Sequence, residues 1–239
     1  MKTKSEKEKE KVLIQLQKDL SLPAIPRHVE CFDNSNFQGS FPVAAMVYFR
    51  DGLPDKNEYR KFNIKTVEGI NDFASMKEVV MRRYKRLLNE GSILPELVII
   101  DGGKGQLNAA LEGLSELGMS GKTSIIGLAK NEEEIFFPGD KESIKLPWNS
   151  ESLKLIRRIR DEVHRFGITF HRNQRSRGTF ANELEGIKGI GKNTADMLLK
   201  KFKSVKKIKA LSEESLEEII GKSKAGIVYD YFNGESHDE

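Results

Sequence analysis

The chain has a single cysteine, Cys31, and no apolar run approaching the ~20 residues that a membrane-spanning helix requires. One cysteine excludes an internal disulfide and a cysteine-built zinc site, and it agrees with a reducing compartment. Residues 1–11 alternate Lys and Glu, where a signal peptide would carry an apolar centre. These absences predict a cytoplasmic protein without a membrane partner.

Net charge is also low, at +4 over 239 residues, and by itself does not indicate a nucleic-acid partner. The distribution is more informative, because residues 151–177 and 181–210 together hold sixteen Lys and Arg against six Asp and Glu. Such a concentration is typical of a surface that binds a polyanion. A solvated helix face is the equally simple alternative.

Apolar periodicity predicts an α/β domain followed by a small all-α domain. Residues 1–26 are interpreted as a charged linker or incomplete helix, and a domain boundary is expected near residues 178–182. Strands are predicted at residues 29–33, 43–50, 58–64, 97–101 and 124–129, a hairpin at 134–146, and helices at 72–89, 107–114 and 150–170. Three early strands, a helix and then alternating strands and helices favour a mixed sheet with helices on both faces.

Two of the predicted strands end on a carboxylate. Asp33 and Asp101 occupy these ends, and His164 lies toward the basic side of the helix at 150–170. Carboxylate oxygens suit Mg²⁺ or Mn²⁺, and a histidine can ligate the metal or transfer a proton. Each residue also has a purely structural interpretation: Asp33 can close an Asx-turn, Asp101 can cap the next helix, and His164 can be a surface imidazole.

The glycines at 102, 103 and 105 do not match the spacing of a phosphate-binding loop. Lys104 remains a candidate phosphate contact, and the glycines would let a nucleic-acid backbone approach closely. The acidic run at residues 132–134 is a further candidate source of a third acid at the sheet edge, although such runs are usually solvated.

A glycine turn between two predicted helices is the strongest binding signal in the tail. Gly189 and Gly191 lie in this turn and Lys188 and Lys192 flank it, so backbone N–H groups and a helix N-terminus can bind phosphate regardless of base identity. An ordinary packing turn is the alternative. The full set of candidate DNA contacts is Lys104, Arg157, Arg160, Lys188, Gly189, Gly191, Lys192 and Thr194.

Several motifs occur in an order that resembles the UvrC family, the nuclease subunit of bacterial nucleotide excision repair. They lie at residues 30–36 with 38–39, 67–69 with 72–76, 97–107, 127–130 and 160–166. The resemblance covers most of the chain from about residue 27. It implies a ribonuclease H-like endonuclease domain at residues 27–178 and a tandem helix-hairpin-helix domain at residues 183–234.

By that resemblance, the catalytic and metal-binding set is Asp33, Asp101 and His164, with Asp72 as a secondary acidic candidate. The resemblance also implies Mg²⁺ or Mn²⁺ as cofactor, an incision on the 5′ side of a lesion, damaged double-stranded DNA with a bubble or junction as substrate, and UvrA and UvrB as partners. Asn36 stands where some family members carry histidine. Gly221 lies in a second, degenerate hairpin.

The family's GIY-YIG nuclease and UvrB-binding segment have no counterpart in residues 1–26, so the chain is expected to be a fragment of a longer protein. Two other functions remain open at this point. One is a non-catalytic DNA-binding or assembly module, and the other is an RNA-cleaving ribonuclease H-like enzyme.

Overall fold

The computed structural model describes residues 3–35, 43–67, 71–129, 133–202 and 204–233, and only the backbone of residues 4, 35 and 169–182. Contacts divide the chain into two compact units, Met1–Thr169 and Phe170–Glu239. Each unit has its own apolar core, centred on the sheet in the first and on short helices in the second. No described helix combines the length and apolar character needed to cross a membrane.

The first unit is built on one mixed sheet with strand order β3-β2-β1-β5-β6-β7, in which β4 also pairs with β2. The two central pairings, β1 with β5 and β5 with β6, are parallel, and the outer ones are antiparallel. The strands are β1 (His28–Ser35), β2 (Val43–Arg50), β3 (Leu53–Pro54), β4 (Arg60–Asn63), β5 (Leu97–Asp101), β6 (Ser124–Ala129) and β7 (Glu134–Phe136).

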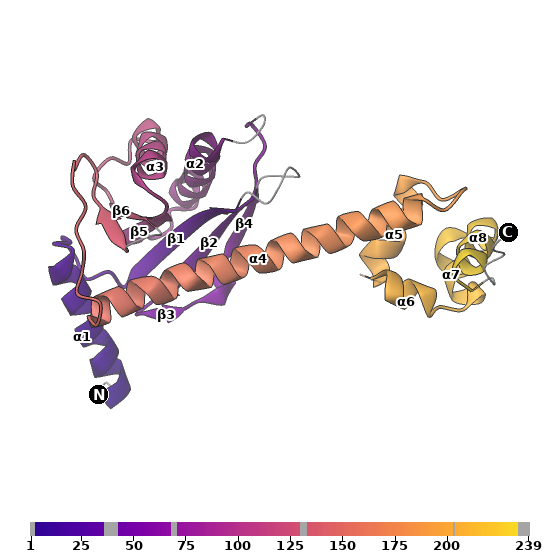
Figure 1. Cartoon of the computed structure of the whole chain (residues 1–239), viewed down its shortest axis with the longest axis horizontal. Coiled ribbons are helices and arrows are strands. Elements are labelled where there is room, and N and C mark those ends of the chain that lie inside the picture. Colours follow the sequence, from indigo (N-terminus) through magenta and orange to yellow (C-terminus); the bar gives the residue numbers. More distant parts are fainter. Residues whose placement is uncertain (1–2, 36–42, 68–70, 130–132, 203, 234–239) are drawn as a thin grey trace. The chain divides into compact units, whose positions relative to one another are not determined.

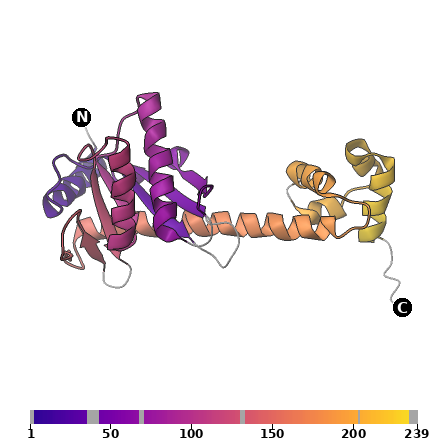
Figure 2. The same cartoon turned by 90° about the horizontal axis from the view of Figure 1, so that it is seen from above.

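Helices cover both faces of this sheet, as the sequence predicts. Helices α2 (Asp72–Glu90) and α3 (Lys104–Glu116) lie side by side on one face, and α4 (Glu151–Glu185) crosses the other (Figures 1 and 2). Successive strand residues alternate between the faces. In β1, Glu30 and Phe32 therefore contact α2, while Asp33 points toward α4.

The segment expected to be a charged linker instead forms a helix of the first unit. Helix α1 (Lys4–Asp19) begins at a capping box between Thr3 and Glu6. Leu13, Leu16 and Leu20 are 1%, 0% and 2% exposed within the sheet domain's core. Their spacing places one apolar stripe on the helix, and burial of that stripe holds the helix on the domain despite its charged remainder.

The helix predicted at 150–170 is longer than expected and runs through the expected domain boundary near 178–182. The contact division falls earlier, between Thr169 and Phe170. No proline interrupts residues 151–185, and an interior glycine such as Gly178 costs a helix only about 1 kcal/mol relative to alanine. A helix can therefore continue past the point where its first core ends.

The second unit consists of the end of α4 and four short helices: α5 (Lys192–Phe202), α6 (Val205–Lys209), α7 (Glu213–Ile220) and α8 (Lys222–Asn233). The turn before α5 and the turn before α8 each contain a glycine with positive φ, 98° at Gly189 and 79° at Gly221. Residues other than glycine rarely adopt such a φ. Both predicted helix pairs are present, and each has a glycine in its turn.

Candidate active site

The parallel pairing of β1 with β5 sets the position of both strand-terminal acids. The register matches Val29 with Leu97 and Phe32 with Ile100. One residue further along each strand stand Asp33 and Asp101, which therefore lie side by side on the face covered by α4. They are only 3% and 2% exposed.

His164 of α4 lies between these two carboxylates. Its Nδ1 is 3.0 Å from Oδ2 of Asp33, and its Nε2 is 2.7 Å from Oδ2 of Asp101. One ligand atom from each of the three residues falls within 4.8 Å of the others. The structure thus brings together the three residues that the sequence singled out from separate strands and a later helix.

The charges of this cluster are strongly coupled. The carboxylates of Asp101 and then Asp33 raise the pKa of His164 from 6.5 to about 10, against a smaller lowering by burial. The imidazole is therefore cationic at neutral pH and supplies the positive charge that two buried carboxylates require. Burial raises the pKa of the Cys31 thiol, and the charges of Asp101 and Asp33 raise this pKa further.

The cluster fits a hard divalent cation. Both oxygens of Asp101 are buried, and neither receives an aligned hydrogen bond from the described residues. The 2.7 Å contact with His164 is therefore an ion pair held by charge. Two adjacent buried carboxylates beside an imidazole form a donor set suited to Mg²⁺ or Mn²⁺. The remaining ligands of such an ion would be water or substrate oxygens.

Asp72, the secondary acidic candidate, lies at the first turn of α2 and outside this cluster. Its backbone carbonyl accepts a hydrogen bond of 2.7 Å from Nδ2 of Asn34, the residue after Asp33. The start of α2 is thereby tied to the end of β1. Asn36, Gln38 and Gly39 lie outside the described residues.

The glycines after Asp101 connect β5 to α3. A Cβ on Gly102 would overlap the side chain of Gln106 at 1.4 Å, and one on Gly127 would lie 3.0 Å from the Gly102 carbonyl oxygen. Gly102 and Gly127 therefore allow close packing at the strand end, whereas a Cβ on Gly103 would meet nothing within 4 Å. Lys104, the candidate phosphate contact, is exposed, and its Nζ donates to the Lys141 carbonyl and lies 5.1 Å from the Phe136 ring centre.

The structure adds a residue that the sequence did not single out individually. Glu133 is 8% exposed and has a positive φ of 54°. Its carboxylate lies 2.5 Å from Arg160 and 3.5 Å from Arg157. The sequence suggests the run 132–134 as a source of a third acid at the site. Glu133 is not part of the cluster of Asp33, Asp101 and His164, and it forms ion pairs with two candidate DNA contacts instead. Glu132 lies outside the described residues.

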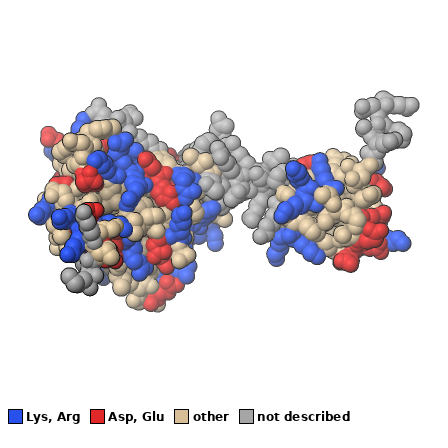
Figure 3. Space-filling view, turned by 90° about the horizontal axis from the view of Figure 1, so that it is seen from below, with Lys and Arg blue, Asp and Glu red and all other residues tan. Residues whose placement is uncertain are grey.

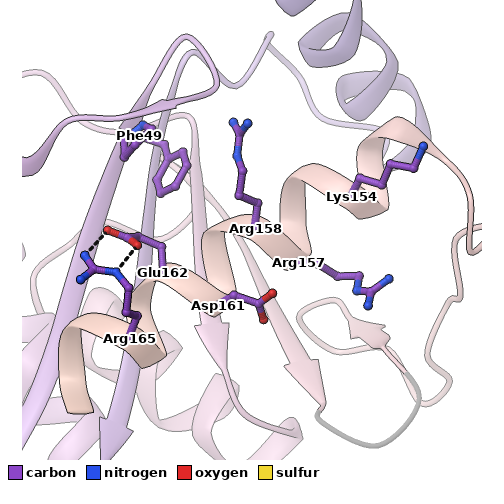
Figure 4. Close-up of a pocket in the computed structure, with 8 residues that line it drawn as sticks. Phe49, Lys154, Arg157, Arg158, Asp161, Glu162 and Arg165 are labelled. Atoms are coloured by element: carbon purple, nitrogen blue, oxygen red, sulfur yellow. Dashed lines mark hydrogen bonds and ion pairs between the residues drawn. The ribbon is translucent and has the colours of Figure 1, made fainter. Parts of the chain in front are cut away.

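An open cleft of about 530 Å³ lies along the solvent side of α4, next to the edge of β2 and β3 (Figure 4). Four cations of α4 line it, and one of them, Arg165, forms a two-contact ion pair with Glu162 at 2.7 Å. The lining residues are Phe49, Pro54, Lys154, Arg157, Arg158, Asp161, Glu162 and Arg165. Mixed charge here agrees with a solvated helix face as well as with a phosphate contact. The side chains of Arg172, Arg175 and Arg177 lie outside the described residues.

In the second unit, the turn before α5 exposes most of the candidate contacts. Lys188, Gly189, Gly191 and Lys192 are exposed, whereas Thr194 is 5% exposed and its Oγ1 accepts a hydrogen bond of 3.1 Å from Lys224. Thr194 therefore joins the two helix pairs. Figure 3 shows that cations and acids of this unit gather on different sides, with Lys rich in α5 and α6 and Glu at the start of α7.

A mixed sheet with acids at its two central parallel strands, followed by two helix-hairpin pairs, defines a ribonuclease H-like domain joined to a tandem helix-hairpin-helix. Residues 17–168 match the family model "UvrC RNAse H endonuclease domain", and residues 181–229 match "SAM-like Helix-hairpin-helix tandem". The first match covers more than half of the chain. The chain belongs to the UvrC ribonuclease H endonuclease domain family.

Relatives support this assignment. "UvrABC system protein C" of Christiangramia forsetii is 55% identical over 225 residues, which cover 94% of this chain and 38% of that protein. The protein of the same name from Porphyromonas gingivalis is 56% identical over 215 residues, or 90% of this chain and 36% of that protein. The chain thus spans less than two fifths of the length of these relatives.

A solved structure of Ciona intestinalis endonuclease V, in complex with a 23mer DNA containing an inosine, is 15% identical to the chain. It has a TM-score of 0.34 over 55% of this chain and 59% of that one. A similarity this low carries no argument about the site.

Proposed function

We propose that the chain is a divalent-metal-dependent endonuclease domain that hydrolyses phosphodiester bonds of DNA. The observation that carries this proposal is the convergence of Asp33, Asp101 and His164, whose ligand atoms lie within 4.8 Å of one another in a buried setting. A sheet that served only as a scaffold would not need two adjacent buried carboxylates at its centre. Membership of an endonuclease domain family supports the same conclusion.

Asp33, Asp101 and His164 would hold the ion. A bound Mg²⁺ or Mn²⁺ supplies Lewis acidity that activates water and neutralises charge developing on the phosphate. The chain's own contribution is orientation: the β1–β5 register fixes the two carboxylates, and α4 places the imidazole against both. Arg160, one helical turn before His164, is ion-paired with Glu133 and Asp161.

The helix-hairpin-helix unit is proposed to bind the DNA backbone. Exposed Lys188 and Lys192 flank an exposed glycine turn, and backbone contacts of this kind position a protein without reading sequence. An endonuclease equipped in this way suits DNA whose shape is altered, such as a bubble or junction. The family resemblance implies an incision 5′ to a lesion in the cytoplasm with UvrA and UvrB as partners. The relatives' shared name, which refers to a UvrABC system, agrees with these partners.

The test compares conservative variants at the acids with a matched surface acid. Asp33→Asn and Asp101→Asn should each lose incision of a bubble substrate by at least 100-fold with Mg²⁺ or Mn²⁺, and should bind Mn²⁺ more weakly in calorimetric titration. Asp51→Asn, in the exposed turn between β2 and β3, should cut and bind metal as the wild type does. Normal incision by either acid variant would disprove the proposed centre.

End-labelled strands of a lesion-containing bubble locate the cut, and a cut away from the 5′ side would disprove that assignment. A parallel assay on RNA:DNA hybrids separates a DNA enzyme from an RNA-cleaving one. Metal-independent DNA binding without any cleavage would favour a non-catalytic assembly module.

A further inference from the structure

Phe73 is an exposed aromatic residue at the sheet edge where β1 and β5 end, on the side of the sheet that α2 and α3 cover. It is the second residue of α2, and it is 56% exposed. In contrast, Phe32, Phe49 and Tyr84 in the same unit are at most 1% exposed. Singly exposed apolar side chains are common, so exposure alone does not make Phe73 a binding residue. Phe73 is of interest because it is connected to the ends of the two strands that carry Asp33 and Asp101.

The ring of Phe73 lies directly on the backbone of Gly105. A Cβ added to Gly105 would come within 2.5 Å of Cε1 and 2.7 Å of Cζ of the ring, so an alanine there would force the ring to move. Gly105 is the second residue of α3 and follows Asp101 by four positions. A chain of that length spans at most about 14 Å, which is roughly four stacked nucleotides.

A second connection ties Phe73 to the other acid. The residue before it, Asp72, accepts the 2.7 Å hydrogen bond from Asn34, which directly follows Asp33. The ring is therefore held between the ends of β1 and β5, one face against Gly105 and much of the remainder open to solvent. Exposed Lys104, beside Gly105, places a positive charge at the same edge.

We propose that Phe73 is a stacking site for an unpaired nucleobase of the strand that is cut. The inference rests on the proposed nuclease function, since it assumes that DNA passes the Asp33–Asp101 pair. Aromatic stacking accepts any base, because every base has a π-face, and it requires a base that has left the duplex stack. Lys104, the candidate phosphate contact, lies at the start of α3 beside Gly105. This site would therefore favour bubbles and junctions over paired DNA.

Tryptophan fluorescence at position 73 can report whether a base stacks there. Phe73→Trp is combined with Trp148→Phe, so that a single tryptophan reports, and a single-stranded oligodeoxynucleotide is added to the full chain in EDTA to prevent cleavage. Stacking should quench the emission. The control is Leu88→Trp in the same background, because Leu88 lies near the far end of α2 and is 41% exposed. Its emission should not change, and equal quenching of both would overturn the proposal.

Affinity gives a second measurement. Phe73→Ala should weaken binding to a bubble substrate about 5-fold to 100-fold, as expected for the loss of one base–aromatic stack. It should bind a fully paired duplex as the wild type does, and Leu88→Ala should leave both affinities unchanged. Phe73→Leu keeps an apolar contact with Gly105 without an aromatic face, so it should show the same loss if Phe73→Ala does not fold. Wild-type affinity of the leucine variant for the bubble would overturn the stacking site.

Cleavage by the wild type separates this inference from the function on which it rests. If the wild type cuts DNA with Mg²⁺ but the indole is not quenched, the stacking site is wrong and the nuclease proposal stands. If the indole is quenched but no metal supports cleavage, the stacking site stands as part of a DNA-binding surface and the nuclease proposal is wrong.

Discussion

At the scale of single residues, His164 has two roles that can be separated. In the absence of metal its imidazolium neutralises Asp33 and Asp101, which would otherwise be two adjacent buried carboxylates. Removing one partner of a buried ion pair leaves an uncompensated charge. The same side chain is the candidate third ligand, so its loss should affect the protein even when no metal is present.

We expect His164→Ala to lower the free energy of unfolding of the metal-free protein by about 1–3 kcal/mol, a value reduced from that of a fully buried pair because the imidazole is 32% exposed. Urea unfolding in EDTA measures it. Adding Asp33→Asn and Asp101→Asn to the same chain should recover part of the loss, because no unpaired carboxylate remains. Equal destabilisation with and without the acids would show that the loss reflects packing only.

Residue types at strand ends made Asp33 and Asp101 candidates in the sequence, whereas the set of Asp33, Asp101 and His164 followed from the family resemblance. A buried apolar run makes a carboxylate at its end conspicuous, and the helical spacing of α4 placed His164 off the core stripe. The Glu133 contacts could not be found this way. Its partners depend on how the loop before β7 meets α4, and an acidic run gives no signal that one member is buried.

At the scale of elements, the two glycines of the first hairpin turn differ in what they require. Gly189 has a φ of 98°, and a Cβ there would lie 3.1 Å from Cδ1 of Ile227. Gly191 has no such φ, and its Cβ would meet nothing within 4 Å. Conformation therefore makes glycine necessary at Gly189, whereas Gly191 has room for a side chain within the protein itself.

Gly189→Ala should accordingly destabilise the second unit by about 1–3 kcal/mol, the usual cost of a strained backbone conformation. Gly191→Ala should leave stability nearly unchanged but weaken DNA binding if phosphate approaches this turn closely. Thermal unfolding and a binding isotherm on the same samples distinguish the two effects. Equal stability of both variants would mean that the positive φ at Gly189 carries no cost.

Apolar periodicity predicted where the strands lie, but it did not predict which helix packs against the core. The strands β2 and β5 match their predicted ranges because apolar runs of that length have few alternatives. The sequence predicts only a linker or an incomplete helix at residues 1–26, because the charged residues there outnumber the three leucines that prove to be buried. Whether such a stripe is buried depends on a complementary surface elsewhere in the fold, which local sequence does not describe.

At the scale of the whole molecule, the chain carries cations in both units, and their effect on DNA binding should depend on salt. Neutralising a phosphate releases bound counterions, so each contact contributes about 0.9 to the slope of log affinity against log salt for duplex DNA. Exposed lysines of the first hairpin turn are the candidates for such contacts.

Lys188→Ala and Lys192→Ala should therefore each reduce that slope by about 1 and weaken binding equally for unrelated sequences. Lys9→Ala, a change on α1, is the control and should leave the slope unchanged. Fluorescence anisotropy across a salt series measures all three. A slope that stays the same in both hairpin variants would place the main phosphate contacts on α4 instead.

The parallel pairing of β1 with β5 also determines when the candidate metal site forms during folding. Asp33 and Asp101 become neighbours only after Val29 has found Leu97, a contact between distant parts of the chain. Such long-range parallel pairs close large loops and form slowly. His164 lies further still along the sequence. A chain that is still being synthesised, or that has collapsed in the wrong register, therefore has no assembled site, so any hydrolytic activity would begin only with completion of the fold.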